Sequence, residues 1–203
     1  MASAALHEAA AGNHQQAISD ATLALKLSQH REVTAMAALS LAQAGDITAA
    51  QKLAAGLNQD LPLDTLVQRY WLPTINAAVA LERKDPQSAV RMLAGMGNLD
   101  FGTISNMVNV FLCPVHIRGN AYLQQGNGLA AAAEFQKFID HRGLVANFPL
   151  GVLARLGLGR AYVLQGNSEK ARSAYQDFLA LWKDADPDIP ILKQAKAEYS
   201  KLR

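Results

Sequence analysis

The chain has 203 residues, of which 50% are hydrophobic but only 6% are aromatic. Alanine and leucine dominate the apolar content and favour helices, whereas the β-branched and aromatic residues typical of strands are scarce. The formal net charge of +2 provides no strong attraction for phosphate backbones or acidic lipids, so we expect no direct nucleic-acid partner.

The apolar stretches are short, and cysteine is almost absent. Residues 108–114, one of the longest stretches, fall far below the roughly 20 residues needed to span a bilayer, so we expect no membrane insertion by this chain. The single cysteine, Cys113, excludes an internal disulfide and a multi-cysteine metal site. The compartment stays open between the cytoplasm and, for a chain tethered behind a membrane span, the periplasm.

A short turn recurs along the chain at intervals of 33, 39, 42 and 40 residues. Its copies are Gly12-Asn13, Gly45-Asp46, Lys84-Asp85, Gly126-Asn127 and Gly166-Asn167. Five residues after the first member of each copy comes an alanine: Ala17, Ala50, Ala89, Ala131 and Ala171. In a helical hairpin the first helix ends in a left-handed residue and the second begins at a capping side chain. The pattern therefore predicts paired helices that cross closely at the alanines.

In chain order, the predicted helices cover residues 2–11, 14–28, 31–44, 47–57, 63–83, 86–95, 103–125, 128–141, 149–165, 168–183 and 188–202. Pro114 fits best in a first turn, so a separate segment over 101–111 remains an alternative to one long helix there. In the last helix, Ile189, Leu192, Ala195 and Tyr199 form an apolar stripe, and Glu198 falls among the polar positions. Asp188 is expected to cap this helix.

The last two copies of the turn stand in a longer shared pattern. Gly119, Tyr122, Gly126, Ala131, Phe135 and Phe138 match Gly159, Tyr162, Gly166, Ala171, Tyr175 and Phe178 in residue class and spacing. Leu158 precedes the second glycine, whereas Arg118 precedes the first. Earlier copies replace the glycine with Ala38 or Ala77.

With this pattern the chain resembles the tetratricopeptide repeat (TPR) family. The resemblance implies an all-α superhelix of about five helical hairpins with a C-terminal capping helix. The chain would be one repeat domain over 1–203, within a longer protein. Its approximate repeats are 1–30, 31–61, 62–100, 101–143 and 144–183, followed by the capping helix at 188–202.

The residues that could carry chemistry do not form a recognisable site. The five histidines lie in different predicted elements without metal-ligand spacing. Asp184, Asp186 and Asp188 lack the glycine and distal glutamate of a calcium loop. We therefore expect no catalytic residue, no metal and no cofactor. An enzyme that holds a small substrate in a groove remains an alternative, with Cys113, His116 and Arg160 as its first suspects.

In TPR stacks the first helices of successive hairpins line a concave groove. The helical phase counted back from each turn predicts six groove residues: Trp71, Thr74, His116, Asn120, Gln124 and Arg160. Such side chains could hold a peptide by hydrogen bonds, although a solvated or packing role is the alternative for each. The carboxylate clamp of some TPR proteins is incomplete here, because Gly157 stands where the hairpin after Asn120 would contribute.

Residues 159–190 resemble the C-terminal TPR region of bacterial, notably acidobacterial, serine/threonine kinases and winged-helix regulators. The resemblance implies a kinase or DNA-binding domain elsewhere in a longer protein, since this chain contains no kinase motif. The predicted function is a non-catalytic protein-interaction or ligand-sensing scaffold whose partner is a protein or peptide. A structural assembly repeat is a further alternative.

Overall fold

The structure is a computed structural model that describes residues 1–101, 112–145 and 148–202. It is 78% helical, and its described residues include no strand. The all-α prediction is confirmed, with helices packed in neighbouring pairs as in a TPR-like stack. The chain divides into two compact units, Met1–Ile104 (unit 1) and Ser105–Arg203 (unit 2).

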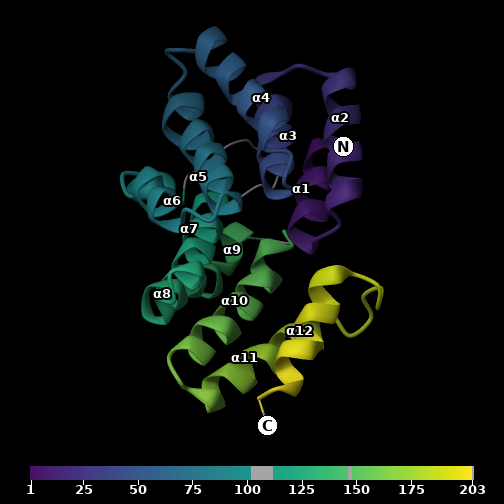
Figure 1. Ribbon diagram of the computed structural model, residues 1–203, viewed down its shortest axis with the longest axis vertical. Helices are drawn as coiled ribbons and strands as arrows, with labels where there is room; N and C mark the ends of the chain where they lie inside the picture. The colour runs from purple at the N-terminus through teal and green to yellow at the C-terminus, as the bar shows by residue number, and fades with distance from the viewer. Residues whose placement is uncertain (102–111, 146–147, 203) are drawn as a thin grey trace. The chain divides into compact units, whose positions relative to one another are not determined.

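Unit 1 is built from three helix pairs (Figure 1). Its α-helices are α1 (Ala2–Ala11), α2 (His14–Leu27), α3 (Arg31–Gln43), α4 (Ile47–Asp60), α5 (Leu72–Glu82) and α6 (Pro86–Leu93). A π-helical segment, η1 (Val67–Trp71), precedes α5, and a short 3-10 helix, η2 (Gly97–Leu99), follows α6. Helix α3 packs against α1, α2, α4 and α5, which makes it the centre of the unit.

Unit 2 contains two helix pairs and a final helix. Its elements are α7 (Cys113–Gln124), α8 (Gly128–Asp140), the short α9 (Arg142–Val145), α10 (Leu150–Leu164), α11 (Ser168–Leu181) and α12 (Pro190–Ser200). Helix α10 packs against α7, α8 and α11, while α12 packs on α11. No helix in the described ranges is long and apolar enough to cross a membrane.

All five turns adopt the predicted backbone geometry. The first residue of each turn, one or two positions beyond the end of the first helix, has a positive φ: 84° at Gly12, 88° at Gly45, 61° at Lys84, 72° at Gly126 and 70° at Gly166. In four of the five pairs the following side chain caps the next helix; Asp46 Oδ1, for example, accepts from the Ala49 N–H at 3.1 Å. Asn13 is the exception, because its amide donates to Glu8 Oε2 at 2.7 Å.

The small residues bring the paired helices together. The five recurring alanines are all fully buried, with 0% exposure. A Cβ at Gly119 would lie 2.8 Å from Phe135 Cζ, and one at Gly159 would lie 2.8 Å from Tyr175 Cδ2. These separations are too short for any side chain, so the aromatic rings occupy the space that the glycines leave.

Three predicted elements differ from the structure or extend beyond it. The helix expected over 63–83 contains the π-helical turn, because Pro73 has no N–H to bond the preceding turn and its ring would clash there. Helix α9 lies in a stretch expected to be a connection. The helix expected over 103–125 is described only as α7; residues 102–111 lie outside the described residues.

Lys84 is the one turn residue that holds the left-handed conformation without being glycine. Replacing it (Lys84→Gly) should raise the free energy of unfolding by about 0.5–1 kcal/mol, because a side chain is strained at positive φ. Lys84 is exposed, so little packing is lost. Urea unfolding followed by circular dichroism measures the change.

The matched control for this prediction is Gly45→Ala. Gly45 has a φ of 88° and no heavy atom within 4 Å of an added Cβ, so only backbone strain should act. This variant should lose a similar amount of stability. Equal stability of Lys84→Gly and the parent chain would contradict the strain argument.

Candidate functional site

Unit 1 contains an open pocket of about 770 Å³ beside α4. We call it the α4 pocket. The end of α2, the start of α3, one face of α4 and the segment after α4 line it. Its apolar lining is Leu25, Leu53, Leu57 and Leu61. Its charged lining is His30, Arg31, Lys52, Asp60 and Asp64. The volume lies in the range of pockets that hold small ligands, about 300–1,000 Å³.

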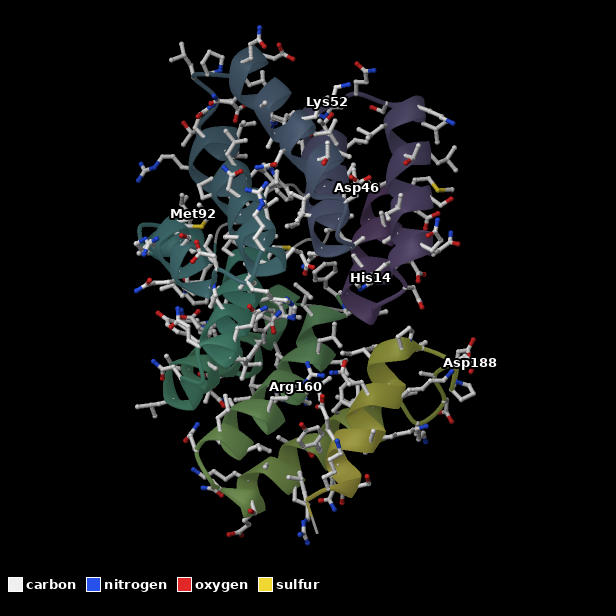
Figure 2. The ribbon with its side chains drawn as sticks, in the orientation of Figure 1. His14, Asp46, Lys52, Met92, Arg160 and Asp188 are labelled. Atoms are coloured by element: carbon white, nitrogen blue, oxygen red, sulfur yellow. The ribbon has the colours of Figure 1, made fainter. Side chains whose placement is uncertain are left out.

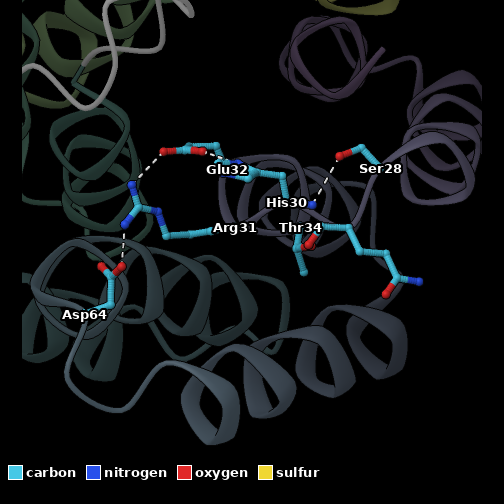
Figure 3. A network of polar contacts seen from close by, with 7 residues as sticks. Ser28, His30, Arg31, Glu32, Thr34 and Asp64 are labelled. Atoms are coloured by element: carbon cyan, nitrogen blue, oxygen red, sulfur yellow. Dashed lines mark hydrogen bonds and ion pairs between the residues drawn. The ribbon is translucent and has the colours of Figure 1, made fainter.

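Arg31 is the centre of a polar network at one wall of this pocket (Figure 3). Its guanidinium donates to Glu32 Oε1 at 2.8 Å and also pairs with Asp64. Glu32 Oε2 in turn lies 2.5 Å from His30 Nδ1. Two carboxylates already neutralise Arg31, so this cation ties the start of α3 to the segment after α4.

The pKa values in this network follow from these contacts. The Val67 N–H and the Arg31 guanidinium lower the pKa of Asp64. Burial opposes ionisation of Glu32, but the combined hydrogen bonds and charges of Arg31 and His30 still lower its pKa. Both carboxylates are therefore ionised at neutral pH and hold Arg31 in place.

The two predicted groove residues of unit 1 lie in its core. Trp71 is 1% exposed and Thr74 is 0% exposed. The Thr74 hydroxyl donates to the Tyr70 carbonyl at 2.6 Å, and the Trp71 ring meets Tyr70 edge to face at 5.3 Å. Neither side chain offers a surface to a partner in this structure.

The three predicted residues on α7 follow one face of that helix from the core to the surface. His116 is 8% exposed, Asn120 is half-buried and Gln124 is exposed. Asn120 Nδ2 lies 3.4 Å from His116 Nδ1. The His116 ring packs edge-on against Phe135 and Phe138. The structure thus brings Asn120 and His116 together, with Gln124 one turn further on.

The environment of Cys113 and His116 does not favour nucleophilic chemistry. Burial raises the pKa of the Cys113 thiol to about 12. Burial, and secondarily the charge of Arg160, lowers the pKa of His116 to about 4. At neutral pH the cysteine is therefore a thiol and the histidine a neutral, weakly basic imidazole. In the parts of the chain that the structure describes, no three His, Cys, Asp or Glu side chains are grouped to hold a metal.

Arg160, labelled in Figure 2, forms an ion pair with Glu198 on the last helix. Its Nε and a terminal nitrogen donate to the two oxygens of Glu198 at 2.9 and 3.0 Å. The Tyr175 hydroxyl donates to the same carboxylate at 2.8 Å. Glu198 was expected on the polar face of α12, but it points inward and joins α12 to α10 and α11. With this contact formed, the Arg160 side chain is 26% exposed.

A second ion pair holds Arg118, which precedes Gly119 as Leu158 precedes Gly159. Arg118 is 6% exposed, and it donates to Glu134 on α8 at 2.7 Å. Lys137 contacts the same carboxylate at 2.9 Å. Arg118 thus links α7 to α8 through a buried charge that Glu134 compensates.

His116 should make unit 2 sensitive to acid. The folded chain keeps its imidazole neutral down to about pH 4, whereas the unfolded chain takes up a proton near pH 6.5. Stability is therefore lost as the pH falls from 6.5 to 4, and His116 alone should account for about 2–3 kcal/mol by pH 4.5. Urea unfolding at pH 7 and pH 4.5 measures this loss. In His116→Gln the loss should shrink by that amount, and an unchanged loss would contradict the assignment.

Removing the charge of Glu198 should loosen α12. Glu198→Gln weakens a bidentate, partly buried contact worth about 1–2 kcal/mol. Amide hydrogen exchange in α12 should then become about tenfold faster, since 1.4 kcal/mol corresponds to a factor of ten. Lys193→Gln is the matched control on the same helix, because its ion pair with Asp188 is exposed and contributes little. Equal exchange in the two variants would argue against Glu198 as the anchor.

Part of the chain is similar to one known protein family. No curated protein matches the chain. A family model described as tetratricopeptide repeat matches residues 118–188, about a third of the sequence. The matched residues run from the middle of α7 through α11, the two hairpins that carry the fuller residue pattern. Residues 118–188 are thus similar to tetratricopeptide repeats, and the paired helices of the described residues are consistent with a TPR-like fold.

Proposed function

We propose that this chain is a non-catalytic module that binds a segment of another protein. TPR repeats generally mediate protein–protein interaction or scaffolding. The observation that carries the proposal is the family match over 118–188, where α7, α8, α10 and α11 form the two hairpins of that family. The protonated Cys113 thiol and the weakly basic His116 favour binding over catalysis.

In unit 2 the proposed contacts are Asn120 and Gln124 on α7. Each primary amide offers both donors and an acceptor, so a row of amides can pair with the backbone of a peptide. His116 supports Asn120 from the core side. Trp71 and Thr74 do not enter the proposed contact surface, because the structure buries both. Arg160 is partly exposed, but its guanidinium is paired with Glu198, so it is not among the proposed contacts.

We also propose that the chain works within a larger bacterial signalling protein, such as a serine/threonine kinase. The resemblance of residues 159–190 to the TPR regions of such proteins supports this context. The test is the full reading frame of the gene. A kinase or winged-helix domain in the same frame would support the proposal, and an unrelated enzyme domain there would contradict it.

The binding proposal is tested by affinity purification from the source cells, with the chain as bait. We expect at least one protein to be recovered with the parent chain and to be depleted about tenfold or more with Asn120→Ala/Gln124→Ala, because each lost hydrogen bond weakens binding. Quantitative mass spectrometry measures the recovery.

Gln136→Ala is the matched control for this experiment. Gln136 lies on α8 and contacts Asp140 on its own helix, so its loss should leave recovery unchanged. Equal recovery with the double variant and the parent chain would show that Asn120 and Gln124 do not contact the partner. Light scattering that shows a concentration-dependent assembly, with no other protein recovered, would favour a structural assembly repeat instead.

A further inference from the structure

Gly56 stands inside α4 and lines the α4 pocket. A glycine within a helix costs roughly 1 kcal/mol relative to alanine. At Gly119, Gly157 and Gly159 close contacts with aromatic rings account for that cost. At Gly56 no heavy atom lies within 4 Å of an added Cβ, so packing inside the chain does not account for it. The glycine leaves the backbone of α4 open to the pocket.

The surface around this opening is apolar. Leu53 and Leu57 flank Gly56 on α4, with Leu57 buried and Leu53 half-buried. Leu25 from α2 and Leu61 from the segment after α4 complete the lining, and both are half-buried. A large apolar side chain placed here would remove these leucine surfaces from water, at about 25 cal/mol for each Å² buried.

The two ends of the opening carry opposite charges. Lys52 lies one turn before Gly56 on α4 and Asp60 one turn after it. The rise of an α-helix therefore separates them by roughly 12 Å. Both side chains are exposed, and neither forms an ion pair within the described residues. The other strong cation at the pocket, Arg31, is already bound by Glu32 and Asp64.

Roughly 12 Å corresponds to about four residues of extended chain. We propose that the α4 pocket binds an extended segment of a partner protein in which a leucine- or phenylalanine-sized side chain lies against Gly56. An acidic residue on one side of this anchor pairs with Lys52, and a basic residue on the other side pairs with Asp60. The inference rests on the proposed interaction function but not on the α7 contacts.

The first experiment fills the pocket. A phage-displayed library of random dodecapeptides is selected on the whole chain, and the enriched peptides are synthesised for affinity measurement. In Gly56→Leu the new side chain occupies the pocket, so these peptides should bind at least tenfold more weakly. The variant should melt at the same temperature as the parent chain or higher, because leucine favours the helix and meets no atom at its Cβ.

Gly95→Leu is the matched control. Gly95 also has no heavy atom within 4 Å of an added Cβ, and it lies in unit 1 outside the pocket lining. The selected peptides should bind this variant like the parent chain. Equal binding to Gly56→Leu and Gly95→Leu would overturn the pocket as their site, and so would a selection that enriches no peptide.

The second experiment tests the charges. Lys52→Asp/Asp60→Lys exchanges the two ends, so peptides with the acidic and basic residues exchanged should now bind better than the original ones. If the original and the exchanged peptides bind the double variant with the same relative affinities as they bind the parent chain, the proposed ligand chemistry is overturned. If the pocket fails while a partner still depends on Asn120 and Gln124, the interaction function stands without this site. If the peptides bind Gly56→Leu more weakly but no partner is depleted with Asn120→Ala/Gln124→Ala, the pocket stands and the α7 contacts do not.

Discussion

Close crossing of paired helices is the constraint on which the rest of the structure depends. Two backbones can approach only where small residues stand at the crossing, and five fully buried alanines occupy these positions, one in the second helix of each pair. In unit 2 two glycines extend the contact, and the rings of Phe135 and Tyr175 fill the space above them. The first three hairpins are paired in the same way, although they lack most of the residue pattern that the last two share.

The parts of the fold set by local chemistry could be predicted from the sequence. A positive φ at the end of one helix and a capping side chain at the start of the next need only adjacent residues, so the turn at Lys84-Asp85 was found even without glycine. The contacts that were missed join distant residues. Glu198 meets Arg160 across 38 positions, and a helical pattern alone assigns a carboxylate to the outer face. Asp188 was expected to cap α12, but it pairs with Lys193 and leaves Ile189 at the cap position.

For the candidate site, too, local features could be predicted from the sequence and contacts between distant residues could not. Core and groove residues recur with the same helical spacing, so the spacing that selected Trp71 and Thr74 could not tell burial from a binding face. On α7 the spacing put His116, Asn120 and Gln124 on one face, but it could not predict how deeply each is buried. The α4 pocket was missed because its lining comes from four segments of unit 1. The one local signal was Gly56, a helix glycine outside the recurring turns, and it needed the structure to show that nothing packs against it.

The charged pairs in both units indicate how the α4 pocket selects a partner. Arg31, Arg118 and Arg160 are each bound by carboxylates of the chain itself, and two of these pairs join separate helices. Arginine suits this role because its planar guanidinium can donate several hydrogen bonds in fixed directions. Lys52 and Asp60 remain for an incoming chain, and at exposed positions such charges orient a ligand more than they hold it. Affinity at the α4 pocket would then come chiefly from the apolar anchor against Gly56, while the two charges set the direction in which the segment lies.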